Sequence, residues 1–145
     1  MKKPRMATRT APAGIIINMF TALTHDIRVT ATPNFESDQS DPDGGLFVFS
    51  YKIDIVNEGR APVQLLSRYW IIIDGDGRKE EVQGPGVIGQ QPVIPSGSRY
   101  SYSSFCPLPT EVGSMRGTYR MRAENGEEFD VAIPTFTLAV PNVLQ

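Results

Sequence analysis

Hydrophobic and polar positions alternate with a period of two along most of the chain after residue 22. In the run 46–57, one set of alternate positions holds Phe47, Phe49, Tyr51, Ile53 and Ile55, and the other set is mixed. Because successive side chains of a strand point to opposite faces, this run predicts a strand with one apolar face. Similar patterns predict strands at 23–32, 63–74, 79–83, 99–105, 117–124, 128–133 and 135–140. Helical spacing is nearly absent.

Short turn sequences separate these runs. Asn125-Gly126 lies between two alternating segments, and these residue types accept the positive φ angles of a type I′ hairpin turn. The segments 57–59 and 74–77 punctuate two further connections. The pattern predicts an all-β fold, an antiparallel β-sandwich of the immunoglobulin or fibronectin type III kind with about 7–8 strands. A closed barrel is the alternative. Trp70, in a strongly apolar run, is expected between the sheets.

Composition narrows the chemistry. The chain has 145 residues and 40% hydrophobic residues, enough for one domain with one core. Cys106 and His25 are each the only residue of their type, which excludes an intrachain disulfide and a multi-cysteine zinc site. His25 has no nucleophile motif such as G-x-S-x-G to serve. We therefore expect a protein that is not an enzyme, needs no cofactor and resides in the reducing cytoplasm.

Charge is distributed unevenly. The formal net charge is -2, but residues 1–9 hold four of the fourteen basic residues, so the rest of the chain is acidic. An acidic body without a basic stripe argues against nucleic acid as a partner. The apolar stretch 13–23 is interrupted by Asn18 and lacks a signal-peptide cleavage pattern. No stretch reaches the ~20 continuous apolar residues of a spanning helix, so no membrane insertion is expected.

One glycine motif is a candidate anion site. Gly84, Gly86 and Gly89 match the pattern G-x-G-x-x-G, which in a βαβ unit holds a pyrophosphate at a helix N-terminus. Pro92 and Pro95 follow and prevent a regular helix. A nucleotide or pyrophosphate would then be held by loop amides and a nearby arginine such as Arg78. A structural loop between strands is the alternative interpretation.

Two groups of charged residues are candidates for a metal site and for a protein-binding surface. The acidic loop 36–43 offers Asp38, Asp41 and Asp43 as oxygen ligands for a divalent cation. It is not an EF-hand, and a solvated loop explains it equally well. Arginine is enriched in recognition surfaces, so a second group, Arg60, Arg68 and Arg78, is the candidate contact set for a protein partner.

Several motifs, in order, resemble the bacterial ApaG family. They occupy the runs 57–70, 74–78, 81–89, 113–117 and 134–141. The resemblance extends from about residue 23 to the C-terminus. It implies a fibronectin type III-like sandwich and a link to cobalt tolerance and magnesium handling. Similar domains in eukaryotic F-box proteins and in a polymerase-interacting protein imply protein binding. It supplies no catalytic residue.

The beginning of the chain departs from that family. Residues 1–18 have little to pack, so we expect either a disordered arm or an upstream-start artefact. The predicted organisation is a disordered or extended N-terminal arm at 1–22 and a sandwich domain at 23–145. The predicted function is a non-enzymatic binding module for an unidentified protein, in a context of cobalt or magnesium homeostasis. A small-anion or nucleotide-binding protein is the alternative, and an open sheet edge is compatible with a homodimer.

Overall fold

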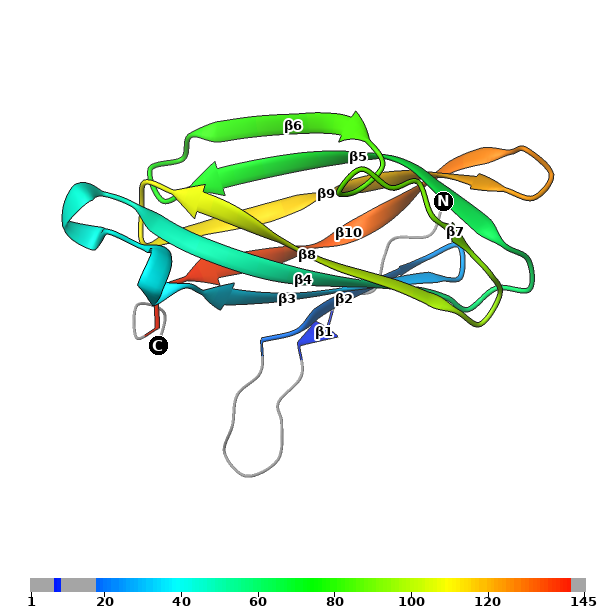
Figure 1. Ribbon diagram of the computed structural model, residues 1–145, viewed down its shortest axis with the longest axis horizontal. Helices are drawn as coiled ribbons and strands as arrows, with labels where there is room; N and C mark the ends of the chain where they lie inside the picture. Colours follow the sequence, from blue (N-terminus) through cyan, green and yellow to red (C-terminus); the bar gives the residue numbers. More distant parts are fainter. Residues whose placement is uncertain (1–6, 9–17, 142–145) are drawn as a thin grey trace, which may run out of the picture.

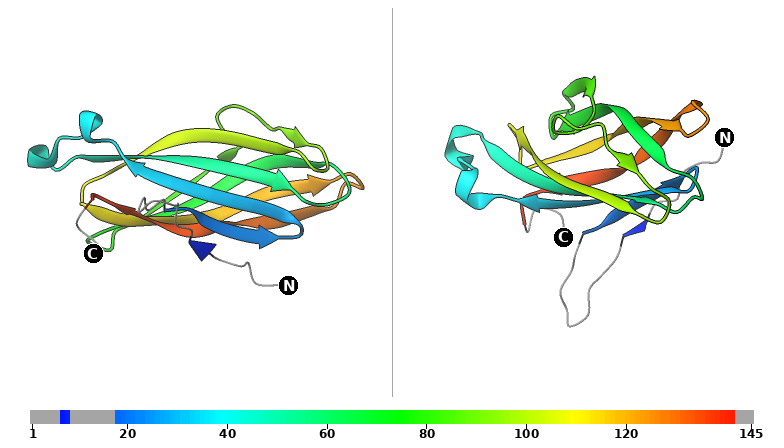
Figure 2. Two further views of the ribbon diagram at one scale, coloured as in Figure 1. Left: turned by 90° about the horizontal axis from the view of Figure 1, so that it is seen from below. Right: turned by 45° about the vertical axis from the view of Figure 1, so that its right-hand side comes forward.

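The computed structural model describes residues 7–8 and 18–141, which form two antiparallel sheets lying face to face (Figures 1 and 2). The first sheet has the order β1 (Ala7–Thr8), β2 (Phe20–Thr24), β3 (Ile27–Phe35), β4 (Phe47–Asn57) and β8 (Arg99–Leu108). The second has the order β10 (Glu128–Ala139), β9 (Val112–Ala123), β5 (Val63–Asp74) and β6 (Lys79–Pro85), with β7 (Val93–Ile94) paired to β5. The predicted antiparallel β-sandwich is confirmed.

Helical structure is limited to two short 3-10 helices between β3 and β4. They are η1 (Ser37–Gln39) and η2 (Pro42–Gly44), and the described residues contain no α-helix. Within that part of the chain, no helix has the length and apolar character needed to cross a membrane.

The core lies between the sheets, as the alternation predicts. The inward positions of β4 are buried, and Trp70 of β5 is 3% exposed, which confirms its predicted place. Its ring packs edge-on against Tyr51 and Phe136, with ring centroids 5.4 and 6.0 Å away. Three strands from both sheets therefore meet in one aromatic cluster.

The single strand predicted at 23–32 is wrong, because a tight turn divides it into β2 and β3. His25 and Asp26 form this turn with φ angles of 50° and 63°. Two successive positive φ angles are the mark of a type I′ turn, and His and Asp tolerate them better than most residues. The sandwich consequently includes Phe20, Thr21 and Ala22, which the sequence assigned to the arm. The remainder of that predicted arm, except residues 7–8 and 18–19, lies outside the described residues.

Two other local predictions need correction. The segments 128–133 and 135–140 form one strand, β10, with a register irregularity between Ile133 and Phe136. The hairpin at Asn125-Gly126 is present, and its turn is closed by a 2.9 Å hydrogen bond from the Gly126 amide to the Ala123 carbonyl. Only Gly126 has a positive φ, of 87°, so the turn is not type I′, which needs two such residues.

The two long sides of the sandwich differ. On the side we call closed, β10 of the second sheet packs against β2 and β3 of the first. The Ala132 amide there donates a 3.3 Å hydrogen bond to the Thr24 hydroxyl, which joins the sheets. On the side we call open, the sheets end in the edge strands β8 and β6. The loop after β6 lies at this side and positions the candidate site.

Candidate functional site

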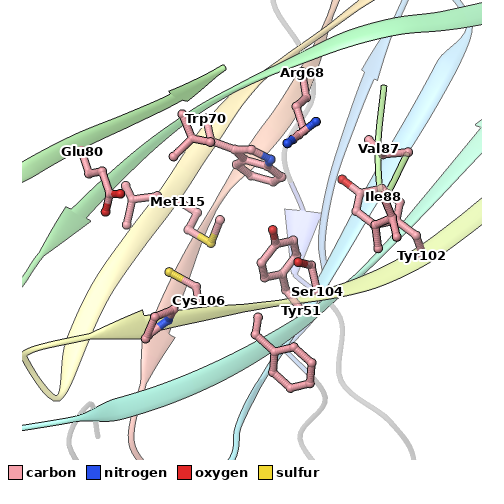
Figure 3. A pocket seen from close by; sticks show the side chains of 14 residues that line it. Tyr51, Arg68, Trp70, Glu80, Val87, Ile88, Tyr102, Ser104, Cys106 and Met115 are labelled. Atoms are coloured by element: carbon pink, nitrogen blue, oxygen red, sulfur yellow. The ribbon is translucent and has the colours of Figure 1, made fainter. Parts of the chain in front are cut away.

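A pocket of about 420 Å³ opens between the sheets at the open side (Figure 3). Its walls come from β4, β5, β6, β8, β9 and the loop that follows β6. Trp70, Tyr51 and Met115 supply apolar surface, whereas Arg68 and Glu80 are its two ionised side chains at neutral pH. Such a volume and such a mixture are typical of ligand-binding pockets.

Arg68 is an arginine on the core-facing side of a strand. It lies two residues before the buried Trp70 and opposite Tyr119 of β9, which is fully buried. Its Nη1 donates hydrogen bonds to the carbonyls of Pro85 and Gly86, at 3.0 and 2.9 Å. Among the ion pairs of the described residues, none involves Arg68. The pocket thus contains a partly buried cation without a carboxylate partner.

The glycine motif provides the space that Arg68 occupies. Gly84 pairs with Arg68 across the two strands, and a Cβ atom at Gly84 would lie 3.0 Å from both terminal guanidinium nitrogens. A Cβ atom at Gly86, where φ is 58°, would lie 2.1 Å from the carbonyl oxygen of Gln90. The first glycine therefore makes room for a side chain, and the second allows a close approach of backbone.

Three amides of this loop, those of Gly86, Val87 and Gln90, donate hydrogen bonds within the protein. The Gly86 amide donates to the Leu66 carbonyl, and Val87 and Gln90 donate to each other's carbonyls, at 2.8 to 2.9 Å. Pro85 has no amide hydrogen to offer. The described residues that follow form no α-helix. These three amides are therefore not free to bind an anion, and Arg68 is the cationic donor that lies beside the loop.

Ile88 stands at the tip of this loop in an unusual conformation. Ile88 and Gly89 are the central residues of the turn between Val87 and Gln90, with φ angles of 46° and 72°. This is again a type I′ turn, whose first central position is normally Asn, Asp or Gly. A β-branched residue there is an outlier. Ile88 is 60% exposed and lines the pocket together with Phe105, which is 56% exposed.

The hydroxyl and thiol groups of the pocket stay protonated at neutral pH. The hydroxyls of Tyr102 and Tyr119 share a hydrogen bond, and burial raises the pKa of both well above 10.0. Burial, assisted by the charge of Glu80, raises the pKa of the Cys106 thiol to about 12. Because the thiolate is the nucleophilic form, this cysteine is not an activated nucleophile.

The structure does not gather the predicted arginines into one cluster. Arg60 lies in the loop between β4 and β5, Arg68 in the middle of β5, and Arg78 in the turn before β6. Gly84 is six residues along β6 from Arg78, which corresponds to about 20 Å. Arg78 is therefore far from the glycine loop that it was predicted to assist, and Arg68 alone of the three lines the pocket.

The predicted acidic metal site is not assembled either. The Asp41 carboxylate caps η2 by accepting a 3.3 Å hydrogen bond from the Gly44 amide. Nowhere in the described part of the chain do three or more His, Cys, Asp or Glu side chains form a group suited to a metal ion. Asp38, Asp41 and Asp43 are thus residues of the exposed loop between β3 and β4.

Sequence reasoning missed the part of the pocket that β8 contributes. Tyr102, Ser104 and Cys106 occupy alternate positions of β8, so they share one face, and all three line the pocket. The alternation of these residues with exposed ones is typical of a strand. It does not predict that Arg68 and Glu80 lie across the pocket from that strand.

Comparisons with known proteins agree on one family. The family model described as ApaG domain matches residues 37–123. Protein ApaG of Methylobacterium sp. (strain 4-46) is 50% identical over 125 residues, which cover 86% of this chain and 96% of that protein. Protein ApaG of Anaeromyxobacter dehalogenans is 51% identical over 126 residues, 87% and 99% of the two chains. The crystal structure of the putative ApaA protein from Bordetella pertussis superposes with a TM-score of 0.80 at 48% identity, covering 83% of this chain and 98% of that one.

Proposed function

Because the chain belongs to the ApaG family, we propose that it is a non-enzymatic module that binds a protein through its open side. The observation that carries the proposal is Ile88. A left-handed backbone costs an L-residue about 1–2 kcal/mol, and this side chain recovers little of that by burial because it is 60% exposed. Strain of this kind, kept where it presents an apolar side chain at a pocket rim, suits a recognition role.

The surroundings of Ile88 support this assignment. Phe105 also lines the pocket, although strand alternation places its exposed side chain on the outer face of β8. Ile88 is therefore the exposed apolar side chain at the rim itself, beside the apolar surface of Trp70, Tyr51 and Met115. The pocket there is large enough to take side chains of a partner.

The chemistry of the pocket favours binding over catalysis. Its thiol and buried phenols are held protonated, and His25 is not among its lining residues. His25 lies instead in the turn between β2 and β3, where its ring packs edge-on against Phe129 of β10 with ring centroids 5.3 Å apart. The imidazole of His25 is therefore not brought to the thiol and hydroxyl groups of the pocket.

A context of cobalt or magnesium homeostasis remains part of the proposal. We assign it to the bound partner, since Asp38, Asp41 and Asp43 do not form a three-ligand group. The second candidate function, binding of a small anion, is favoured by one observation: the guanidinium of Arg68 has no carboxylate partner among the described residues. In that case Arg68, rather than the amides of Gly84 to Gly89, would hold the anion.

The proposal is tested with full-length chain immobilised in three forms: wild type, Ile88→Asn and Val93→Ser. Val93 is the matched control, because it is 59% exposed and does not line the pocket. A protein captured from cell extract is purified, and its binding to each form is titrated. We expect saturable binding to wild type and Val93→Ser, and binding at least about tenfold weaker to Ile88→Asn. Equal affinity of all three forms would contradict the proposal.

A further inference from the structure

The free edge of β8 is weakly protected between residues 100 and 106. β8 is the last strand of the first sheet, and among the described residues it pairs only with β4. Residues 100–106 carry no formal charge and no proline, and Arg99 and Pro107 stand at the two ends of this run, whereas the facing edge strand β6 carries Lys79, Glu80, Glu81 and Pro85. Within the described residues, the backbone hydrogen bonds of 100–106 go to no segment other than β4. Natural edges are usually blocked by charges, prolines or a covering segment, so the stretch 100–106 of this edge is open to an added strand.

The second sheet presents three different groups to that edge, in a row. The cross-strand pairs Arg68–Gly84, Trp70–Val82 and Ile72–Glu80 lie on its inner face at successive alternate positions. A cation, an apolar surface and a carboxylate therefore follow one another along the paired strands β5 and β6. Gly84 and Glu80 are four residues apart, so the two charges are separated by about 13 Å along the strand.

The residues of β8 that line the pocket follow the same order. Glu80 lies on the Cys106 side of the pocket and Arg68 on the side of Tyr102, which is four residues from Cys106 in β8 (Figure 3). The row of groups on the second sheet is therefore aligned with Tyr102, Ser104 and Cys106 on the first. A strand added beside β8 would direct every second side chain into the pocket, at this same spacing.

We infer that the open side binds an extended peptide segment that adds to the free edge of β8. Three side chains of the segment point into the pocket. A basic one contacts Glu80, an apolar one contacts Trp70, and an acidic one contacts Arg68. For the antiparallel direction, the commoner one in sheets, the segment reads from its N-terminus as basic, any, apolar, any, acidic. This inference rests on the proposed function and specifies its partner.

Charge decides between a peptide and a second copy of this chain. If two copies paired through β8, each would offer the other Tyr102, Ser104 and Cys106 at the inward positions. None of these ionises at neutral pH in this environment, so the charges of Arg68 and Glu80 would stay without partners. A segment with one basic and one acidic side chain supplies both.

The inference is tested with a labelled peptide whose centre is Lys-Thr-Val-Thr-Glu, flanked by threonines, titrated against the full chain by fluorescence polarisation. A peptide with the two charges exchanged and one with glutamine at both positions are compared with it. We expect the first peptide to bind at least about tenfold more tightly than either. Methylation of the backbone nitrogens that face β8 abolishes binding, whereas methylation of the alternate nitrogens does not.

Reversing a charge in the protein and the matching charge in the peptide distinguishes lost recognition from lost folding, because an unfolded variant would bind neither peptide. Arg68→Glu is expected to lose the first peptide and to bind one with Lys in place of its Glu. Arg78→Glu, with the same change in net charge outside the pocket, binds the first peptide as wild type does. If Arg68→Glu unfolds, Glu80→Arg provides the same test with a peptide carrying Glu in place of Lys, because Glu80 is exposed.

The outcomes separate this inference from the proposed function. If none of the peptides binds, or all bind alike, while a purified partner still loses affinity for Ile88→Asn, the peptide inference is overturned and the protein-binding module stands. If wild type sediments as a dimer that substitutions in β8 disrupt, and peptides do not compete with it, a second copy occupies the edge and the inference is overturned. If Ile88→Asn binds every partner like wild type, the proposed function itself falls.

Discussion

The closed and open sides of the sandwich are built from the same kind of alternating strands, but their inner positions carry different residues. At the closed side, Phe20 packs against Phe136 with ring centroids 6.4 Å apart, and Thr24 accepts a hydrogen bond from the backbone of β10. At the open side, the inner face instead holds Arg68 and Glu80. Once one side and the centre supply the apolar burial, the other side can hold charged groups that remain accessible to a ligand.

The largest contrast is expected between two phenylalanines. Phe136 is fully buried and packs against Tyr51 and Trp70, so Phe136→Ala should lower the free energy of unfolding by about 3–5 kcal/mol. Phe105 at the open side is 56% exposed, and Phe105→Ala should change it by about 0.5 kcal/mol or less. Urea unfolding of both variants measures the difference. Similar losses for the two would mean that the open side is part of the core.

The second-largest effect is expected from alkaline pH, which should lower the free energy of unfolding through groups buried at the open side. Burial raises the pKa of Cys106 from 9.0 to about 12, and also raises those of Tyr102 and Tyr119 above 10.0. Groups with a raised pKa in the folded state contribute stability that is complete below their unfolded pKa, near 9.0 for the thiol, and is lost as pH rises through the folded value.

We therefore expect the free energy of unfolding to fall by about 2 kcal/mol or more between about pH 8 and pH 10.5. Urea unfolding across this range measures it. Cys106→Ala removes one of the titrating groups and should give a shallower fall. A pH-independent free energy in wild type would contradict the assigned burial of these groups.

A substitution at the pocket rim is expected to raise the free energy of unfolding by a smaller amount. Ile88→Asn places a residue that tolerates the left-handed region at φ 46°, so the free energy of unfolding should rise by about 1 kcal/mol. Val93→Asn changes an equally exposed residue without relieving a positive φ and should leave stability nearly unchanged. Thermal and urea unfolding measure both. A destabilised Ile88→Asn would show that Ile88 serves the fold rather than recognition.

A small loss of stability is expected when Gly84 gains a side chain. In Gly84→Ala the new Cβ meets only the flexible end of Arg68, at 3.0 Å, so we expect a loss below about 1 kcal/mol together with a displaced guanidinium. The NMR shift of the Arg68 side-chain NH reports that displacement. Gly86→Ala is the comparison, because its Cβ would lie 2.1 Å from the Gln90 carbonyl oxygen, and it should cost more. Equal losses of stability for the two variants would contradict the conclusion that Gly84 makes room for the flexible end of Arg68.

Local pattern was sufficient for most of the fold. Alternation along β4 predicted its buried face, and the apolar run around Trp70 predicted a place in the core. Turn residues predicted the hairpins at 74–77 and 125–126. The errors lie where local pattern permits two answers. His25-Asp26 continues a strand pattern equally well as it forms a type I′ turn, and the pairing of β2 with β3 selects the turn.

The candidate site was decided by long-range pairing. Counting alternate positions from the buried Leu65 places Ser67 and Tyr69 inside and Arg68 outside. An irregularity between Leu65 and Ser67, in the pairing of β5 with β9, inserts one residue and reverses this phase, so Arg68 and Trp70 face inward. The sequence by itself determined that the chain forms a two-layered β-sandwich, because alternation is a property of each strand alone. Which side would stay open, and which charges would face it, depended on pairings between strands distant in the chain, and only the tertiary structure sets those.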